Sequence, residues 1–267
     1  MPASHLRPQL ARDGIFNLRD LGGIPVDDGR VLRRGMLVRA DALQRSSGST
    51  VRALHVHGIR RVLDLRDDSE RDLSGAFTVV DDLDIEVRFV PVLDPTYEWD
   101  LDGVEMEALL AHRYEDILTN FGDRLADAVT AIADADGGVA FHCAVGKDRT
   151  GLLAMLVLGA LGAADEVIVA DYARSSLATG VQVQWIRTLG LPHGPRDDEE
   201  MATGVWSARA VTMQRTLDHL DRDHGGVTAY LRGIGVDDDA LDLMRSRLLV
   251  DPDLPTSGPP SGPSEQG

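Results

Sequence analysis

The sequence has 267 residues, with 44 acidic and 27 basic side chains and a formal net charge of −17. A field this negative disfavours binding to nucleic acid and to anionic membranes. The composition is 43% hydrophobic, which is enough to bury a core and excludes an intrinsically disordered protein. Cys143 is the single cysteine, so the chain can form neither an intramolecular disulfide nor a metal site made of several thiolates.

The first half of the chain predicts a mixed sheet. An Asp28-Gly29 turn signal lies between apolar residues, which indicates a hairpin over residues 24–39 and an antiparallel start to the sheet. A short helix is expected over Ser49–His57, and the segment behind the strand that follows it is expected to be a polar loop. Buried strands are predicted over Arg61–Leu65, Val87–Val92 and Val139–Phe141, and two helices between residues 100 and 134, broken near Gly122.

The second half predicts helices only. Helical patterns cover residues 165–174, 181–189, 208–219, 227–234 and 240–249, interrupted by Pro192-His193-Gly194-Pro195 and an acidic patch at Asp197–Glu200. From Asp251 the chain is rich in Pro, Gly and Ser, which is typical of a flexible tail. We therefore expect one domain over residues 1–250, with a helical lid or insert at about 175–225, and a disordered tail over 251–267.

The strongest chemical signal is the tight loop between the strand at 139–141 and a buried helix at 150–161. Backbone N–H groups in such a loop point inward, and the helix adds its positive end, so the loop can cradle a phosphate. Arg149 offers a planar fork to two phosphate oxygens, and Gly146 allows a backbone conformation that a Cβ would forbid. The residues expected to bind phosphate are Ala144, Val145, Gly146, Lys147, Asp148 and Arg149.

Cys143 is the predicted nucleophile. A free thiol with a pKa of about 8.5 is only slightly ionised at neutral pH, but the groups that hold phosphate also stabilise a thiolate. Attack on phosphorus would give a phosphocysteine that water hydrolyses, without a metal or a cofactor. Thr150 can donate its hydroxyl to the departing sulfur, and His142 can orient the loop through its backbone. Both are expected to be supporting residues.

The order Cys, five residues, Arg, Thr is the signature of the cysteine-dependent protein tyrosine phosphatases. The loop resembles their atypical bacterial branch, which carries His-Cys-x-x-Gly-Lys-Asp-Arg-Thr-Gly and has triple-specificity and phosphoinositide-active members. Residues 17–23, 34–39 and 62–66 extend the resemblance, although Leu18 stands where that branch has Phe. The resemblance implies an α/β fold with a central mixed sheet flanked by helices, and a helical lid toward the C-terminus.

The same resemblance implies a protein tyrosine phosphatase. Its expected substrates are phosphotyrosine first, then phosphoserine, phosphothreonine and phosphoinositides, and it links Lys147 to the phosphoinositide activity. The partner would be a phosphorylated protein or a small phosphate ester, without nucleic acid or stable membrane association. Distant acidic side chains are screened over roughly 8 Å at physiological salt, so the net charge does not exclude a local phosphate site.

The general acid stays open among three aspartates, any of which could protonate the leaving group. The resemblance favours Asp148, because that branch has Asp inside the loop and lacks the Trp-Pro-Asp loop of eukaryotic relatives. Asp94 follows the strand at 87–92, where dual-specificity phosphatases keep their acid, and Asp64 ends the strand at 61–65. We rank Asp148 first, Asp94 second and Asp64 third.

The alternative to an enzyme is a phosphate-binding pseudophosphatase without turnover, which the intact Cys143, Arg149 and Thr150 disfavour. Arg19 and Asp20 are expected to form an ion pair that braces the loop. No metal site is expected. Residues 1–14 contain no apolar signal-peptide core, and no apolar run is long enough to span a membrane, so the sequence predicts a cytoplasmic protein.

Overall fold

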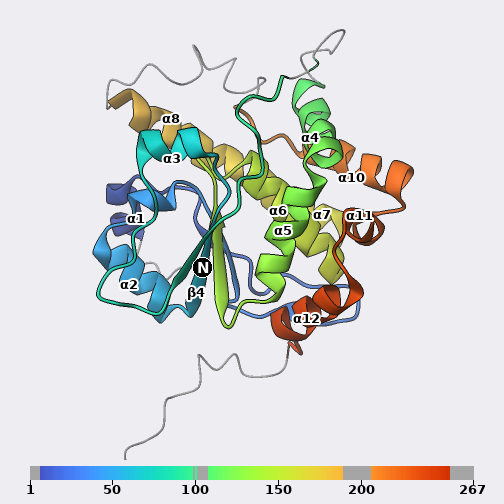
Figure 1. The fold of residues 1–267 in the computed structure, drawn as a ribbon, viewed down its shortest axis with the longest axis horizontal. Coiled ribbons are helices and arrows are strands. Elements are labelled where there is room, and N and C mark those ends of the chain that lie inside the picture. The colour runs from blue at the N-terminus through green and yellow to red at the C-terminus, as the bar shows by residue number, and fades with distance from the viewer. Residues whose placement is uncertain (1–6, 99, 101–107, 189–205, 253–267) are drawn as a thin grey trace, which may run out of the picture.

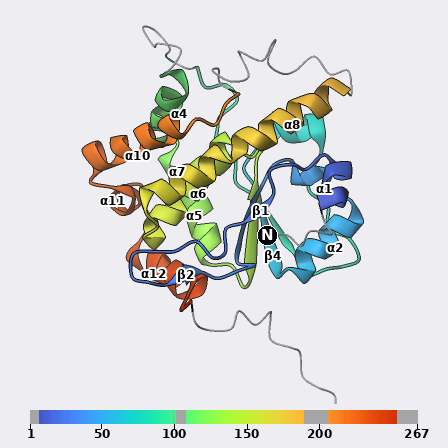
Figure 2. The same cartoon turned by 180° about the vertical axis from the view of Figure 1, so that it is seen from behind.

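The computed structural model describes residues 7–98, 100, 108–188 and 206–252, and it has a central five-stranded sheet with helices on both faces (Figures 1 and 2). The strand order is β1-β3-β6-β4-β5. The β1–β3 pair is antiparallel and the other pairs are parallel, so the predicted α/β fold with a mixed sheet is confirmed. The strands are β1 (Arg19–Asp20), β3 (Leu37–Ala40), β4 (Ile59–Asp64), β5 (Glu86–Phe89) and β6 (Gly138–His142).

Alternation along the strands divides the core into two clusters, because successive side chains of a strand point to opposite faces. Leu63 and Phe141 belong to the larger cluster, together with the apolar helix α6 (Asp148–Leu161). Val62 and Ala140 belong to the smaller cluster on the other face. The smaller cluster is covered by α1 (Arg7–Asp13) and α2 (Gly48–Val56).

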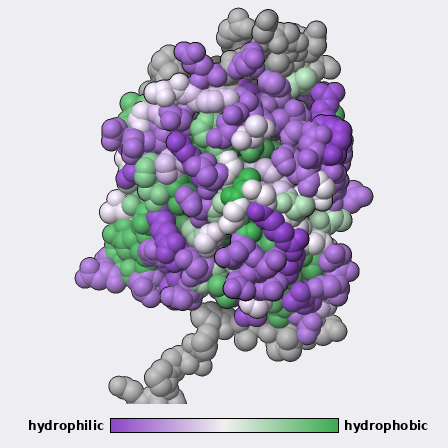
Figure 3. All heavy atoms as spheres, turned by 45° about the vertical axis from the view of Figure 1, so that its right-hand side comes forward, coloured by the Kyte–Doolittle hydropathy of each residue, from purple (hydrophilic) through white to green (hydrophobic). Residues whose placement is uncertain are grey.

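Most of the remaining helices lie on the face of the larger cluster, and the outer surface on that side is mainly hydrophilic with scattered apolar patches (Figures 1 and 3). Helix α8 runs past the end of the sheet where the parallel strands finish (Figure 2). The helices not yet given are α3 (Asp68–Ser74), α4 (Leu109–Asn120), α5 (Gly122–Ala133), α7 (Asp165–Ala173), α8 (Ser175–Thr188), α10 (Ala210–His224), α11 (Val227–Gly233) and α12 (Asp238–Leu248).

The predicted hairpin around Gly29 is present: Pro25 and Val31 form an antiparallel bridge, and the N–H of Leu32 donates to the carbonyl of Ile24 at 2.8 Å. Two other predictions about secondary structure are wrong. The second arm of the hairpin, β2 (Val31–Leu32), also pairs with β7 (Leu249–Val250) in a separate two-stranded sheet. The second half of the chain is therefore not helical throughout. Residues 68–74, expected to be loop, form α3 because Asp67 and Glu70 make a reciprocal capping box at its start.

The predicted break between two helices at Gly122 is confirmed, as is the helix that ends before Gly58. The predicted insert at 175–225 includes the whole of α8 and α10. Its residues 189–205, with Pro192–Pro195 and Asp197–Glu200, lie outside the described residues, as does the tail from 253 onward. No helix in the described part of the chain is long and apolar enough to span a bilayer.

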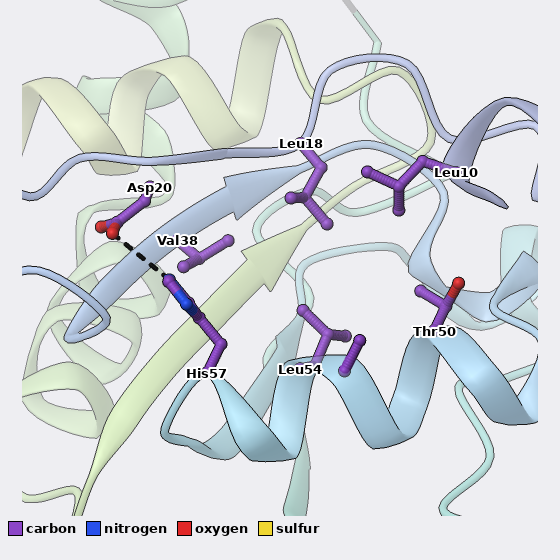
Figure 4. Close-up of a pocket in the computed structure, with 8 residues that line it drawn as sticks. Leu10, Leu18, Asp20, Val38, Thr50, Leu54 and His57 are labelled. Atoms are coloured by element: carbon purple, nitrogen blue, oxygen red, sulfur yellow. Dashed lines mark hydrogen bonds and ion pairs between the residues drawn. The ribbon is translucent and has the colours of Figure 1, made fainter. Parts of the chain in front are cut away.

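Asp20 forms a junction beside α2 instead of pairing with Arg19. Its carboxylate accepts the N–H groups of Gly22 (2.8 Å) and Gly35 (3.0 Å), and it lies 3.3 Å from Nε2 of His57 (Figure 4). The predicted Arg19–Asp20 pair is wrong because neighbouring residues of a strand face opposite sides. The small apolar cavity beside this junction has a volume of about 30 Å³, room for little more than one water molecule.

Candidate active site

The predicted phosphate loop lies at the carboxyl edge of the parallel strands. Cys143 follows β6 directly, and α6 begins at Asp148. Open α/β sheets bind their ligands at this edge. Gly146 has φ +70°, and a Cβ at that position would lie 2.5 Å from the carbonyl oxygen of Ala40. Glycine is therefore required for the loop to pack against β3.

The loop surrounds the sulfur of Cys143 with positive partial charge. The N–H of Gly146 donates to Sγ at 3.2 Å. The 14-residue helix α6 starts immediately after the loop, so the positive end of its dipole lies at the site. Only 2% of Cys143 is exposed. A thiolate here would be stabilised by hydrogen bonding and by the helix, as in known reactive cysteines.

Arg149 lies in the first turn of α6 and is held by Glu70 of α3. Both terminal nitrogens of the guanidinium bind the two carboxylate oxygens, with Nη2 2.8 Å from Oε1. Burial acts to lower the pKa of Arg149, but Glu70 and Cys143 raise it above its ordinary value. Oε2 of Glu70 also accepts the N–H of Asp67 at 3.1 Å. One carboxylate thus caps α3 and fixes the plane of the guanidinium.

Asp148 is the aspartate that the structure places at the site. Its Oδ1 accepts the hydroxyl of Tyr114 at 2.6 Å and lies 3.3 Å from Nζ of Lys147. The hydroxyls of Tyr114 and Tyr172 are 2.8 Å apart. Burial raises the pKa of both tyrosines, so they keep their protons. The Asp148 side chain is 35% exposed, which leaves it accessible to a ligand.

Neither of the other two candidate acids shares this position. Asp94 accepts hydrogen bonds from the hydroxyl (2.7 Å) and N–H (2.9 Å) of Thr96 and lies 3.6 Å from Arg124; these contacts lower its pKa. Asp64 is buried and held by two hydrogen bonds from Arg66. Burial acts to raise the pKa of Asp64, but Arg66 leaves it below its ordinary value. Neither of these two carboxyl groups lines the cavity that lies over the loop, whereas Asp148 does.

A cavity of about 250 Å³ lies over the loop. Val145, Lys147, Asp148 and Arg149 of the loop line it, whereas Cys143, Ala144 and Gly146 do not. Lys147 contributes to the wall, but it is 2% exposed and its Nζ is 3.5 Å from the carbonyl of Ser207. The lining residues are Leu93, Leu110, Arg113, Tyr114, Ile117, Val145, Lys147, Asp148, Arg149, Thr179 and Trp206. Within the described ranges, no group of three or more His, Cys, Asp or Glu side chains could hold a metal ion.

His142 and Thr150 flank the loop, and both are buried. Nδ1 of His142 donates to the carbonyl of Cys143 at 3.2 Å. Burial lowers the pKa of His142 to about 4, so the ring is neutral at pH 7. The hydroxyl of Thr150 is buried and has no hydrogen-bond partner among the described residues, so it remains available as a donor.

Behind the loop, Asp171 of α7 joins two buried arginines. Its Oδ1 is 2.6 Å from Nε of Arg19, and its Oδ2 is 2.6 Å from Nη1 of Arg39. Burial acts to raise the pKa of Asp171, but the two cations lower it to about 2. Arg39 also donates to the carbonyl of Gly146 at 2.9 Å. Arg19 therefore braces the loop through Asp171, not through Asp20.

Sequence reasoning missed Glu70, Arg39, Asp171 and Tyr114. For Glu70 a signal was available, because Asp67-x-x-Glu70 is the spacing of a capping box and predicts a helix start. The other three come from separate elements, and their contact with the loop depends on the tertiary fold.

Comparison with known proteins identifies the family of the chain. The profile of the tyrosine phosphatase family matches residues 10–250. The chain is 30% identical to a candidate tyrosine-protein phosphatase of Cupriavidus necator, over 91% of this chain and 87% of that protein. It is 27% identical to the triple specificity protein phosphatase PtpB of Mycobacterium tuberculosis, over 88% of this chain and 97% of the relative.

Among solved structures, TpbA of P. aeruginosa in complex with pTyr aligns over 82% of this chain and 90% of its own length, with 15% identity and a TM-score of 0.31. The family profile covers most of the described chain, and two curated phosphatases match along nearly all of their length. The chain belongs to the tyrosine phosphatase family and is a protein tyrosine phosphatase.

Proposed function

We propose that the protein hydrolyses phosphate monoesters, phosphotyrosine first, through a phosphocysteine formed at Cys143. The observation that carries this proposal is the hydrogen bond from Gly146 N–H to Sγ of Cys143, in a loop that ends on Arg149 at the start of α6. These groups hold the phosphate oxygens and stabilise the attacking thiolate at the same time.

The phosphate is bound by the N–H groups of residues 144–149 and by the guanidinium of Arg149. Glu70 holds that guanidinium in one plane, which reduces the freedom lost when a phosphate binds. The dianionic phosphate then has its phosphorus next to Sγ of Cys143. This arrangement supplies the orientation that an in-line displacement needs.

The reaction has two steps. The Cys143 thiolate forms an S–P bond while the P–O bond to the leaving group breaks, and protonated Asp148 gives its proton to the leaving oxygen. Water then attacks the phosphocysteine, Asp148 takes a proton from that water, and the S–P bond breaks. Inorganic phosphate leaves. Thr150, whose hydroxyl is buried and unpartnered among the described residues, donates to the sulfur as the thiolate re-forms.

The walls of the cavity favour an aromatic ester. Leu93, Leu110, Ile117 and Trp206 provide apolar surface beside the phosphate loop, which suits the ring of phosphotyrosine. PtpB is described as a triple specificity phosphatase, so phosphoserine and phosphothreonine are further substrates. The Nζ of Lys147 lies against Asp148 and Ser207, which disfavours its use on a second phosphate. Phosphoinositides therefore rank last, and soluble phosphoproteins or small aryl phosphates rank first.

Turnover of para-nitrophenyl phosphate in EDTA tests the proposal. We expect hydrolysis on the order of one turnover per second or faster, and rapid quenching should trap phosphate covalently on Cys143, detectable by mass spectrometry. Because Cys143 is the single cysteine, any phosphothiol is assigned without ambiguity. A protein that binds phosphate but shows no turnover at any pH from 5 to 8 would be a phosphate-binding module instead.

The role of Asp148 is tested with two leaving groups. Asp148→Asn should slow an alkyl phosphate by roughly 10²- to 10⁴-fold, because a poor leaving group needs the proton, and should slow an activated aryl phosphate much less. Asp94→Asn is the matched control and should change neither rate by more than about twofold, since Asp94 does not line the cavity. Equal losses on both esters in Asp148→Asn would show that Asp148 is not the acid.

A further inference from the structure

Several carbonyl groups of the phosphate loop accept hydrogen bonds from residues outside the loop. The carbonyl of Cys143 accepts the N–H of Ala42 at 3.1 Å. The carbonyl of Gly146 accepts from two side chains, Nδ2 of Asn17 at 2.8 Å and Nη2 of Arg39 at 2.9 Å. Three donors from the N-terminal part of the chain, on Asn17, Arg39 and Ala42, therefore bind carbonyl groups of the loop.

Asn17 contacts two consecutive peptide groups of the loop. Its Nδ2 lies 2.8 Å from the carbonyl of Gly146 and 3.4 Å from that of Val145. Its Oδ1 accepts from Nη1 of Arg19, so the amide has one orientation that satisfies both ends. Only 4% of the residue is exposed, so bulk solvent has little access to these bonds.

Because the peptide group is planar, a hydrogen bond that fixes a carbonyl also fixes the direction of the N–H group in the same plane. The carbonyl of one residue and the N–H of the next share a rigid plane and point in opposite directions. Holding the Val145 carbonyl outward points the N–H of Gly146 inward, and holding the Gly146 carbonyl outward does the same for the N–H of Lys147. A glycine makes rotation of these planes easier, because no Cβ restricts its φ and ψ. The loop therefore needs an external restraint at this place.

We propose that Asn17 is a positioning residue of the active site, which locks the peptide planes 145–146 and 146–147 so that their N–H groups face the sulfur and the phosphate. The proposal rests on the proposed function, because those N–H groups matter as ligands of a thiolate and a phosphate. Asn17 touches neither the substrate nor the sulfur.

The anchor of Asn17 is itself rigid. Its backbone N–H donates to Oδ1 of Asp41 at 2.9 Å, and Asp41 also accepts the N–H of Phe16 at 3.1 Å. Asp41 is fully buried, and Gln182 of α8 lies 3.4 Å from both its Oδ2 and the carbonyl of Ala144. Because these bonds fix the backbone of Asn17, its side chain can restrain the loop without being displaced together with it.

Two substitutions test the donor. Asn17→Asp keeps the size and the acceptor for Arg19 but removes the donor, whereas Asn17→Leu is an uncharged residue of similar size that lacks both the donor and the acceptor. For both we expect the pH at half-maximal alkylation of Cys143 by iodoacetamide to rise by roughly one unit, which is a tenfold loss of thiolate at a given pH. We expect kcat/KM on para-nitrophenyl phosphate to fall by roughly 10- to 100-fold, mainly in kcat.

Arg247→Ala is the matched control. Arg247 also donates from a side chain to buried carbonyls, those of Ile132, Ala133 and Gly137, each at 2.8 Å, but it does so where β6 begins and not where the loop follows it. Its loss should lower the Tm while leaving the alkylation profile and kcat unchanged. If Asn17→Asp or Asn17→Leu does not fold, Asn17→Ser replaces them, because it shortens the donor without adding charge or bulk.

The outcomes separate the two proposals. Folded Asn17 variants that keep the wild-type alkylation profile and kcat/KM overturn the positioning role, even if their Tm falls as in Arg247→Ala. A shift in Asn17→Asp without one in Asn17→Leu also overturns it, because the added charge would then be the cause. A wild-type protein without turnover overturns the proposed function alone, since the alkylation profile does not depend on turnover.

Discussion

Cys143→Ser is expected to lower kcat by roughly 10⁴-fold or more while phosphate binding persists. A serine hydroxyl is far harder to ionise than a thiol, and one N–H from Gly146 and the end of α6 do not supply the difference. The groups that hold the phosphate oxygens are unchanged by the substitution. The affinity for tungstate, measured by calorimetry, should therefore stay within a few-fold of that of the wild-type protein.

Arg149→Lys is expected to weaken both binding and chemistry in the same assays. A lysine keeps the charge but loses the planar fork and the two-point contact with Glu70, so tungstate affinity and kcat/KM should both fall, the latter by roughly 10³-fold. Residual turnover in Cys143→Ser at more than a few per cent of the wild-type rate would mean that the thiol is not the nucleophile.

Asp171→Asn is expected to produce the largest loss of stability, about 3–5 kcal/mol in urea unfolding at pH 7. The substitution removes the charge that compensates two buried cations, Arg19 and Arg39, whose side chains are 7% and 1% exposed. Asp28→Asn is the matched control: the Asp28–Arg30 pair has the same 2.6 Å separation but lies in solvent, so the loss there should be far smaller. Similar losses in both variants would contradict this interpretation.

The effect of Asp171 has a defined pH dependence. Its pKa in the folded protein is about 2, against 3.8 for an ordinary aspartate, so its carboxylate contributes stability above about pH 4 that is lost as the pH falls toward 2. The expected loss is on the order of 2 kcal/mol, and it should be absent in Asp171→Asn. A difference between variant and wild type that is the same at pH 7 and pH 3 would exclude this linkage.

Asp41 acts in the opposite direction. Burial raises its pKa to about 6, so its contribution to stability is complete below about pH 4 and is lost as the pH rises through 6. The two buried aspartates therefore affect separate pH ranges. The lowered pKa of Asp171 adds to the acid loss below pH 4, and the raised pKa of Asp41 adds a gain between pH 6 and pH 4.

The phosphate loop could be predicted from the sequence because its residues are contiguous. Cys143, Gly146 and Arg149 take their relative positions from one short strand–loop–helix segment, and local geometry is enough to place them. The strands could be found for a similar reason, since apolar runs such as residues 61–65 and 139–141 mark buried strands.

The supporting contacts could not be predicted because their partners are far apart in the chain. Glu70 reaches Arg149 across 79 positions, and Arg19 reaches Asp171 across 152. A charged residue has many partners of opposite sign in a chain with this much charge, and the sequence alone does not select one. The choice among Asp148, Asp94 and Asp64 stayed open for the same reason: it depends on which side chain reaches the cavity wall.

The strand β7 and its pairing with β2 were missed. The predicted hairpin already places Val31–Leu32 in a strand, but Leu249–Val250 is too short to show an alternating pattern and lies beside the stronger signal of a helix. Their pairing appears only once the fold brings the two ends of the domain together.

The pairing of β2 with β7 also means that folding cannot be completed until the end of the domain has been synthesised. Residues 17–42 supply two strands of the main sheet and donors to the phosphate loop, yet their partners β6, α7 and β7 emerge from the ribosome only later. The nascent N-terminal segment therefore exposes its apolar strand faces until these partners have been synthesised. Folding dominated by such long-range contacts is slow. The exposed apolar faces can therefore aggregate or bind chaperones before the sheet is complete.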